Sequence, residues 1–245
     1  MTRVKKVLSA INPLNLRKRR AAKPPASPFG GFRKRTMTAR ELAASAVSLV
    51  PDAPTLYRVW VKHEIDPGFR EELMLAVSKL NDCRYCSWGH HEWANIAGVS
   101  EEELASVEQM DPAHFDRRKW IAISFARELV TARFGRISKD LMQEMKANYS
   151  AREIREIILI AKIMDIGNRG ANTWDSMLAR LRGQPAAESR IIDETVLSAV
   201  FLTLAPIVVL FLARASKRSF REMARSLIDY TKHMEAQSKE SAGSH

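Results

Sequence analysis

Apolar residues recur every three or four positions along most of residues 39–184, with Leu73, Val77 and Leu80 as one clear stripe. This spacing places them on one face of a helix, whereas a half-buried strand would alternate apolar and polar residues. No segment shows a convincing alternation of that kind. The pattern therefore predicts an all-α domain over residues 39–184.

Helix boundaries are marked by residues that satisfy unpaired backbone groups. Ser100 followed by Glu103, and Ser150 followed by Glu153, have the spacing of a capping box, which opens a helix. Gly98 is expected to end the helix before it, because glycine tolerates the left-handed conformation common just past a helix end.

An uncharged segment of nineteen residues, 195–213, follows the predicted domain. As a helix it would rise roughly 28 Å, close to the hydrocarbon thickness of a bilayer. Five basic residues come next, as expected beside anionic headgroups: Arg214, Lys217, Arg218, Arg221 and Arg225. Residues 185–245 are thus predicted to form a membrane-anchor helix with a basic amphipathic tail, and the alternative is a helix buried in the core or in a subunit interface.

The net charge of +11 comes from the beginning of the chain. Residues 1–40 contain twelve Lys and Arg and no acidic residue, whereas the rest has 27 basic and 28 acidic residues. Residues 1–38, rich in Pro and Gly, are predicted to be a basic flexible arm. With an apolar segment at the other end, an anionic membrane is the expected partner and nucleic acid is not.

The two cysteines of the chain, Cys83 and Cys86, lie three residues apart, and His90 lies four residues after the second. On a helix capped by Asn81 or Asp82, these side chains share one face, and Cys83 lies in the first turn. A disulfide between the cysteines is then feasible, the helix N-terminus favours a thiolate, and the imidazole can move a proton. The pattern predicts a thiol redox site.

Two alternatives to a redox site remain open. A zinc site usually has four ligands, and Cys83, Cys86 and His90 supply three. A pair of inert, buried cysteines is also possible. Covalent haem attachment is excluded because Ser87, and not a histidine, follows the second cysteine. We expect no metal and no other cofactor.

The spacing of Glu71, Cys83, Cys86 and His90 resembles the E-x11-C-x-x-C-x-x-x-H signature of the alkylhydroperoxidase D and carboxymuconolactone decarboxylase superfamily. The resemblance implies an all-helical fold and a thiol peroxidase or disulfide reductase. It assigns Cys86 as the peroxidatic cysteine and Cys83 as the resolving cysteine nearer the surface. His90 would be the proton-relay residue and Glu71 the carboxylate that orients it.

The resemblance also implies partners: a peroxide substrate, a dithiol electron donor such as a lipoyl protein, and association into trimers or larger homo-oligomers. Tyr85 departs from the family's peroxidases, which have a histidine at this position, and this places rapid peroxide turnover in doubt. The decarboxylase branch typically lacks the cysteine pair, so lactone decarboxylation is less expected.

Other polar and aromatic residues are given ordinary structural roles. Glu72 is expected to be a solvated carboxylate, because helix phase places it away from Glu71. Asp165 and Arg169 are expected to pair on a helix surface, and Trp88 and Trp93 are interpreted as packing residues.

The sequence thus predicts a thiol-dependent peroxidase or disulfide reductase acting on organic hydroperoxides. The alternatives are a membrane-tethered redox sensor or interaction protein without turnover, and a zinc-stabilised module. The charge bias around residues 195–213 favours a cytoplasmic tail and redox chemistry favours a cytoplasmic domain, which one span cannot both provide. We expect a membrane-associated protein with a cytoplasmic catalytic domain, or else a soluble cytoplasmic protein.

Overall fold

The computed structural model describes residues 32–112 and 115–243 of the chain, with side chains described as far as Met234. These residues contain helices and no strand, which confirms the predicted all-α class. The helices, in chain order, are α2 (Ala39–Leu49), the short 3-10 turn η1 (Val50–Asp52), α3 (Ala53–Trp60), α4 (Pro67–Leu80), α5 (Arg84–Ile96), α6 (Glu101–Gln109), α7 (Arg117–Thr131), α8 (Lys139–Asn148), α9 (Ala151–Leu181), α10 (Ile191–Ala215) and α11 (Phe220–Gly243).

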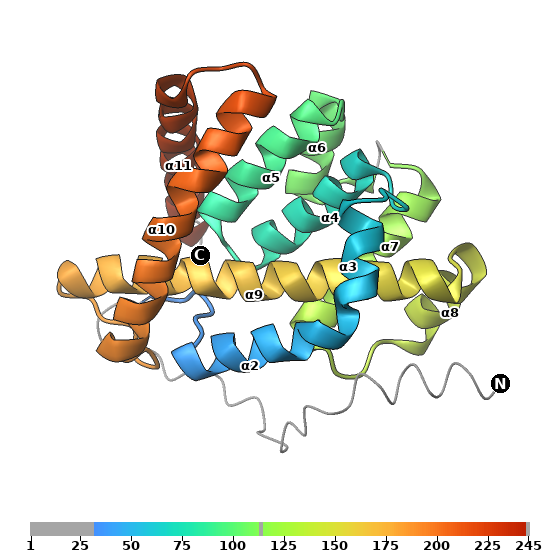
Figure 1. The fold of residues 1–245 in the computed structure, drawn as a ribbon, viewed down its shortest axis with the longest axis horizontal. Coiled ribbons are helices and arrows are strands. Elements are labelled where there is room, and N and C mark those ends of the chain that lie inside the picture. Colours follow the sequence, from blue (N-terminus) through green and yellow to red (C-terminus); the bar gives the residue numbers. More distant parts are fainter. Residues whose placement is uncertain (1–31, 113–114, 244–245) are drawn as a thin grey trace.

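The long helix α9 crosses the whole molecule and supports the other elements (Figure 1). Helix α4 packs between α5, α7 and α9, and ten of its fourteen residues are buried. The core is formed by apolar side chains of these helices, including Leu73, Phe125, Ile157 and Ile160. Burial of such side chains is the main stabilising contribution, at about 1.5–3 kcal/mol each.

Predicted caps are found at three helix ends. Ser150 and Glu153 form the complete capping box of α9, and Gly98 has a φ of 87° just past α5. At α6 only half of the box forms: Ser100 accepts from the backbone of Glu103, whose carboxylate binds Lys119 at 2.7 Å instead. A cation within reach thus replaces the second capping bond.

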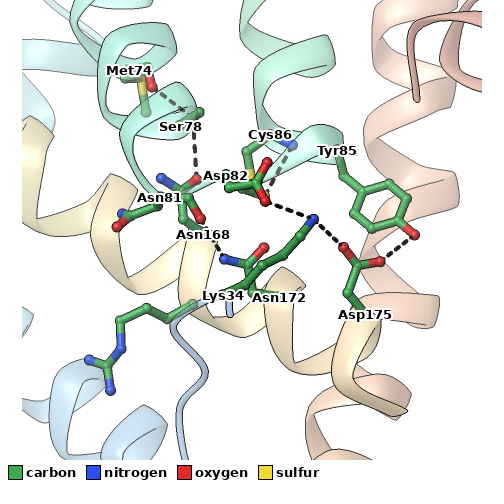
Figure 2. The surroundings of a disulfide bond; sticks show 12 residues. Lys34, Met74, Ser78, Asn81, Asp82, Tyr85, Cys86, Asn168, Asn172 and Asp175 are labelled. Atoms are coloured by element: carbon green, nitrogen blue, oxygen red, sulfur yellow. Dashed lines mark hydrogen bonds and ion pairs between the residues drawn. A yellow bond between two sulfur atoms is a disulfide. The ribbon is translucent and has the colours of Figure 1, made fainter. Parts of the chain in front are cut away.

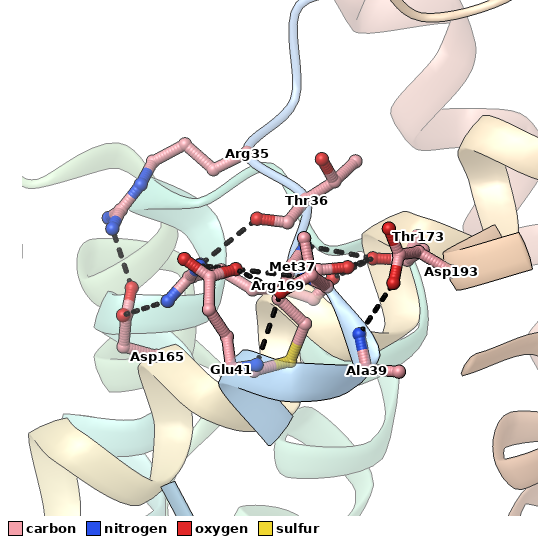
Figure 3. Close-up of polar contacts among 10 residues, drawn as sticks. Arg35, Thr36, Met37, Ala39, Glu41, Asp165, Arg169, Thr173 and Asp193 are labelled. Carbon is pink, nitrogen blue, oxygen red and sulfur yellow. Dashed lines mark hydrogen bonds and ion pairs between the residues drawn. The ribbon is translucent and has the colours of Figure 1, made fainter. Parts of the chain in front are cut away.

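Residues 32–38, which the sequence analysis includes in the basic arm of residues 1–38, contact the helical domain. Figure 3 shows this segment along α9. Nη1 of Arg35 lies 3.0 Å from Oδ1 of Asp165, and the backbone amide of Met37 donates to Thr173 Oγ1 at 3.0 Å. Met37 is buried, and its side chain fixes the segment further. Residues 1–31 lie outside the described part of the chain.

Helices α10 and α11 stand side by side at one end of α9 and also contact α5 (Figure 1). Helix α10 is long and apolar enough to cross a membrane, and 28% of its most apolar stretch of 18 residues is buried against the rest of the protein. Its buried side is a stripe that includes Leu197, Val209 and Leu212. Both its ends are tied to the domain by polar contacts: Glu194 in the first turn binds Arg180 and Ser176, and Arg218 just past the last turn binds Glu92.

Candidate redox site

Cys83 and Cys86 meet at the beginning of α5 and are joined in a disulfide, with Cα atoms 5.4 Å apart. The prediction that Asn81 or Asp82 caps this helix is wrong, because Cys83 is itself the N-cap. Its sulfur accepts a hydrogen bond from the backbone amide of Cys86 at 3.3 Å. Asp82 has a φ of 52°, which turns the chain so that the next residue reaches the cap position (Figure 2).

The two sulfurs differ in access, and the difference is the reverse of the expectation. Cys83 is fully buried, whereas Cys86 is only partly buried against the core. The capping position explains this result, because it directs the Cys83 side chain back over the first turn of α5. Cys86 is therefore the sulfur that a reactant approaches from solution.

His90 and Glu71, predicted from sequence to form a relay, are in direct contact. Nδ1 of His90 lies 2.7 Å from Oε2 of Glu71, which comes from the neighbouring helix α4. An ionised carboxylate can only accept, so Nδ1 carries the proton and Nε2 is left to accept another. His90 is four residues from Cys86, and the two lie on the same face of α5.

Glu71 is buried and fixed from two sides. Its other oxygen, Oε1, lies 2.8 Å from Nη2 of Arg70. Burial alone would raise the pKa of Glu71, but the hydrogen bond and charge of His90, together with Arg70, hold it below its ordinary value. The carboxylate is therefore ionised near neutral pH and can orient the imidazole. Sequence reasoning did not single out Arg70, although it directly precedes Glu71.

Tyr85, between the two cysteines, points away from them toward a group of charges. Its hydroxyl lies 3.0 Å from Oδ1 of Asp175, which also binds Arg84 at 2.6 Å and Lys34 at 2.9 Å (Figure 2). Burial, and then the Asp175 carboxylate, raise the pKa of Tyr85 to about 12. The phenol therefore stays protonated and cannot act as a base. Lys34 also lies 3.6 Å from Asp82, next to the buried cysteine.

Buried amides fill the space between the cysteine loop and α9. Asn172 donates to the carbonyl of Asn81 at 2.8 Å, and the Asn81 side chain donates to Asp165 at 3.1 Å. The prediction that Asp165 and Arg169 pair on the helix surface is wrong about the location. Asp165 is buried, and it bonds to Arg35 and Asn81. Arg169 lies 4.0 Å from it.

Glu72 is not the solvated carboxylate that was expected. It is completely buried, and Oε2 lies 2.9 Å from Nζ of Lys119 on α7. Burial raises the pKa of Glu72 to about 7, even though Lys119 acts in the opposite direction. The two adjacent glutamates therefore face different surroundings, Glu71 toward the imidazole and Glu72 toward α7.

The tryptophans of α5 have packing roles, as predicted. Trp88 is buried beneath α10 and α11 and donates its indole N–H to Ser226 at 3.0 Å, and Trp93 borders the same cluster. Gly89 is also buried, but a methyl group added there would meet no atom within 4 Å. It follows Cys86 by three residues, so this free space lies on nearly the same face of α5 as the accessible cysteine.

These contacts define a helical thiol–disulfide protein with an imidazole–carboxylate pair beside the disulfide. Residues 55–128 match the model of the carboxymuconolactone decarboxylase family, which confirms the resemblance to the alkylhydroperoxidase D-like superfamily. All four predicted site residues lie within the matched segment. No curated protein and no solved structure matches the chain.

Proposed function

We propose that the chain is a thiol-dependent peroxidase or disulfide reductase that acts on organic hydroperoxides. The observation that supports this most directly is the hydrogen bond between His90 and Glu71. His90 lies on the same face of α5 as Cys86, and Glu71 reaches it from α4. A peroxidatic cysteine needs a nearby base to form its thiolate, and an imidazole fixed by an ionised carboxylate is such a base.

The reaction starts with the reduced pair. The Cys86 thiolate attacks the terminal oxygen of the hydroperoxide, the O–O bond breaks, and Cys86 becomes a sulfenic acid. The alkoxide that leaves takes the proton that His90 received from the thiol. The Cys83 sulfur then attacks the Cys86 sulfur, a water molecule leaves, and the disulfide forms. In total, a hydroperoxide and two thiols give an alcohol, water and a disulfide.

A dithiol electron donor, for example a lipoyl group, closes the cycle. Because Cys83 is fully buried, we expect the donor to attack Cys86 and to release Cys83 as the thiolate. The backbone amide that bonds to the Cys83 sulfur stabilises this thiolate, and a better-stabilised thiolate leaves faster. This order follows from the burial of Cys83, which the sequence-based expectation had placed nearer the surface.

The decisive experiment follows consumption of cumene hydroperoxide by the reduced full-length chain with dihydrolipoamide as donor. We expect turnover in the parent and none in Cys86→Ser, whereas Cys83→Ser should form one sulfenic acid per chain, detected by mass spectrometry, without further turnover. If the cysteines of the parent chain oxidise once but peroxide is not consumed catalytically, the proposed enzymatic function is contradicted.

A second candidate is a redox sensor without turnover, tethered to a membrane. It is favoured by Tyr85, which cannot supply the second base found in the family's peroxidases, and by Lys34, which connects the cysteine loop to the basic arm. The same turnover assay separates the two functions.

The location and assembly of the chain form part of the proposal. Helix α10 and the basic residues after it support association with an anionic membrane. We place the catalytic domain in the cytoplasm because its thiols need a reducing compartment. The family resemblance supports a homo-oligomer, a trimer or larger. Light scattering of the purified chain tests the assembly, and cell fractionation tests the location.

A further inference from the structure

The outer surface of α10 is apolar almost throughout. Beyond the buried stripe, the large apolar side chains between Val200 and Phe211 are 38–60% exposed. They include Val200, Leu202, Leu204, Ile207, Leu210 and Phe211. A contiguous surface of this kind is uncommon on a protein surrounded by water. Some apolar phase or partner is needed to cover it.

Helix α10 nevertheless remains attached to the domain along its length. Glu194 in its first turn binds Arg180 of α9, and Arg218, just beyond its last turn, binds Glu92 of α5 at 3.0 Å. A helix that crossed a bilayer would have to break these ion pairs or bring them into hydrocarbon, which is costly. The structure therefore favours a helix that lies flat, with the domain on one side and lipid on the other.

The charges at the end of α10 favour an anionic surface as that covering phase. Arg214, Lys217, Arg221 and Arg225 are exposed around the turn between α10 and α11. Each basic side chain near an anionic membrane surface contributes about 1 kcal/mol. A second copy of the chain would bring the same positive group to the contact, so lipid is the better electrostatic match.

The redox site lies beside this surface. The ring of Tyr85, adjacent to Cys86, packs against Phe201 of α10 with ring centroids 4.9 Å apart. Phe201 also stacks on Trp174 of α9, which fixes its position. Gly89 follows Tyr85 by four residues and Cys86 by three, so its open space lies between the accessible sulfur and the side of α5 that faces α10.

We propose that α10 lies in the plane of an anionic membrane and that the substrates of the site are hydroperoxides of membrane phospholipids. This inference rests on the proposed peroxidase function. A hydroperoxide group on an acyl chain is polar and therefore tends toward the headgroup region, the depth at which an in-plane helix lies. The open space beside Gly89 then admits the oxidised part of the chain, and Cys86 reduces it to an alcohol by the steps given above.

The test uses the full-length chain and two substrates. One is phosphatidylcholine hydroperoxide in vesicles with or without phosphatidylglycerol, and the other is cumene hydroperoxide in solution. Vesicle binding is measured by flotation. The variant Leu204→Gln/Phe211→Gln makes the outer surface of α10 polar, and Val47→Gln/Val61→Gln changes two exposed apolar residues away from α10 as a matched control.

We expect the parent to bind anionic vesicles more tightly than neutral ones and to reduce both substrates. In the α10 variant, activity on vesicles should fall at least about tenfold, because apolar area is lost at the lipid contact. Its activity on cumene hydroperoxide should stay unchanged. The control should match the parent on both substrates.

Two results would overturn the inference and leave the peroxidase intact. One is a parent that reduces cumene hydroperoxide but not the vesicle lipid. The other is an oligomer that dissociates when α10 is made polar, because α10 would then be a subunit interface. If the parent reduces neither substrate, the proposed function itself fails, and the inference fails with it.

Discussion

Arg35 and Asp165 are 130 residues apart in the chain, and Nη1 of the arginine lies 3.0 Å from Oδ1 of the aspartate. Asp165 is buried, so this pair fixes the segment before α2 to the middle of α9 (Figure 3). Asp165 also accepts from Asn81, which directly precedes the cysteine turn. The end of the basic arm is thereby connected to the backbone that positions the disulfide.

Arg35→Ala should lower the free energy of unfolding by about 2–4 kcal/mol, because it removes the short ion pair of the buried Asp165 carboxylate and leaves only Arg169, at 4.0 Å. Urea unfolding measures the change. Arg33→Ala removes the same charge from an exposed position two residues earlier and should change stability by less than about 0.5 kcal/mol. Equal effects of the two variants would contradict a specific role for the Arg35 contact.

Glu71→Gln should reduce kcat/KM for cumene hydroperoxide about tenfold to a hundredfold, because His90 loses the carboxylate that fixes its tautomer. Glu71→Asp keeps the charge and should recover part of the activity. Glu72→Gln serves as a matched control, since that carboxylate faces Lys119 and not the imidazole. A loss of activity as large in Glu72→Gln as in Glu71→Gln would show that both act through stability alone.

The stability of the chain should depend on pH through Glu72. Its pKa is about 7 in the folded chain against an ordinary value of 4.5, so between these pH values the folded state holds more protons than the unfolded state. Stability therefore falls as pH rises through this window, by at most about 3 kcal/mol.

Glu72→Gln cannot ionise and should lack this decline, whereas Lys119 keeps its bond to Glu103 at 2.7 Å. Urea unfolding of the parent and the variant at several pH values from 4.5 to 8 measures the difference. Parallel stability curves for the two proteins would rule out a raised pKa at this carboxyl.

Reagent access should follow the burial of the two sulfurs. In the reduced chain, Cys86 of the Cys83→Ser variant should react with an aromatic disulfide reagent about tenfold faster than Cys83 of Cys86→Ser, because the second sulfur is fully buried. Absorbance of the released thiol gives both rates. A faster Cys83 would mean that stabilisation of its thiolate by the helix N-terminus outweighs burial, and the donor would then meet Cys83 first.

Much of the site could be predicted from the sequence because its contacts depend on helical spacing. Cys83, Cys86 and His90 lie at the start of or on one helix, so periodicity places them on the same face. Glu71 lies on the helix before it, and its assignment to the relay came from the family resemblance. The burial of Glu72 could not be predicted in this way, because it depends on Lys119 of α7, a helix that the local pattern does not place. The same holds for Lys34 and Asp175, which are 141 residues apart.

The helix limits were predictable where a side chain caps the end, as at Ser150, or where a glycine adopts the left-handed conformation, as at Gly98. Cys83 was not recognised as a cap, because cysteine is not among the residues that usually cap helices. Its role depends on the left-handed turn at Asp82, a conformation that is uncommon for residues other than glycine, although aspartate adopts it more readily than most.

Gly89 offers a test in which stability and activity should move in opposite directions. An alanine in a helix interior is favoured over glycine by about 0.5–1 kcal/mol, and an added methyl group meets no atom within 4 Å. Gly89→Ala should therefore raise the midpoint of thermal unfolding, measured by circular dichroism. Gly89→Leu fills more of the same space and should slow the reduction of cumene hydroperoxide more than that of hydrogen peroxide, which needs little room.

If Gly89 were needed only for close packing, the opposite result would follow: larger side chains at this position would lower stability and affect both substrates equally. If Gly89→Leu instead reduced both peroxides at the parent rate, the space beside Cys86 would play no part in admitting substrate. Higher stability in Gly89→Ala together with discrimination against the larger peroxide in Gly89→Leu is the combination that a substrate path produces, because the helix gains from the added methyl group while a larger side chain takes the place of the reactant next to the sulfur.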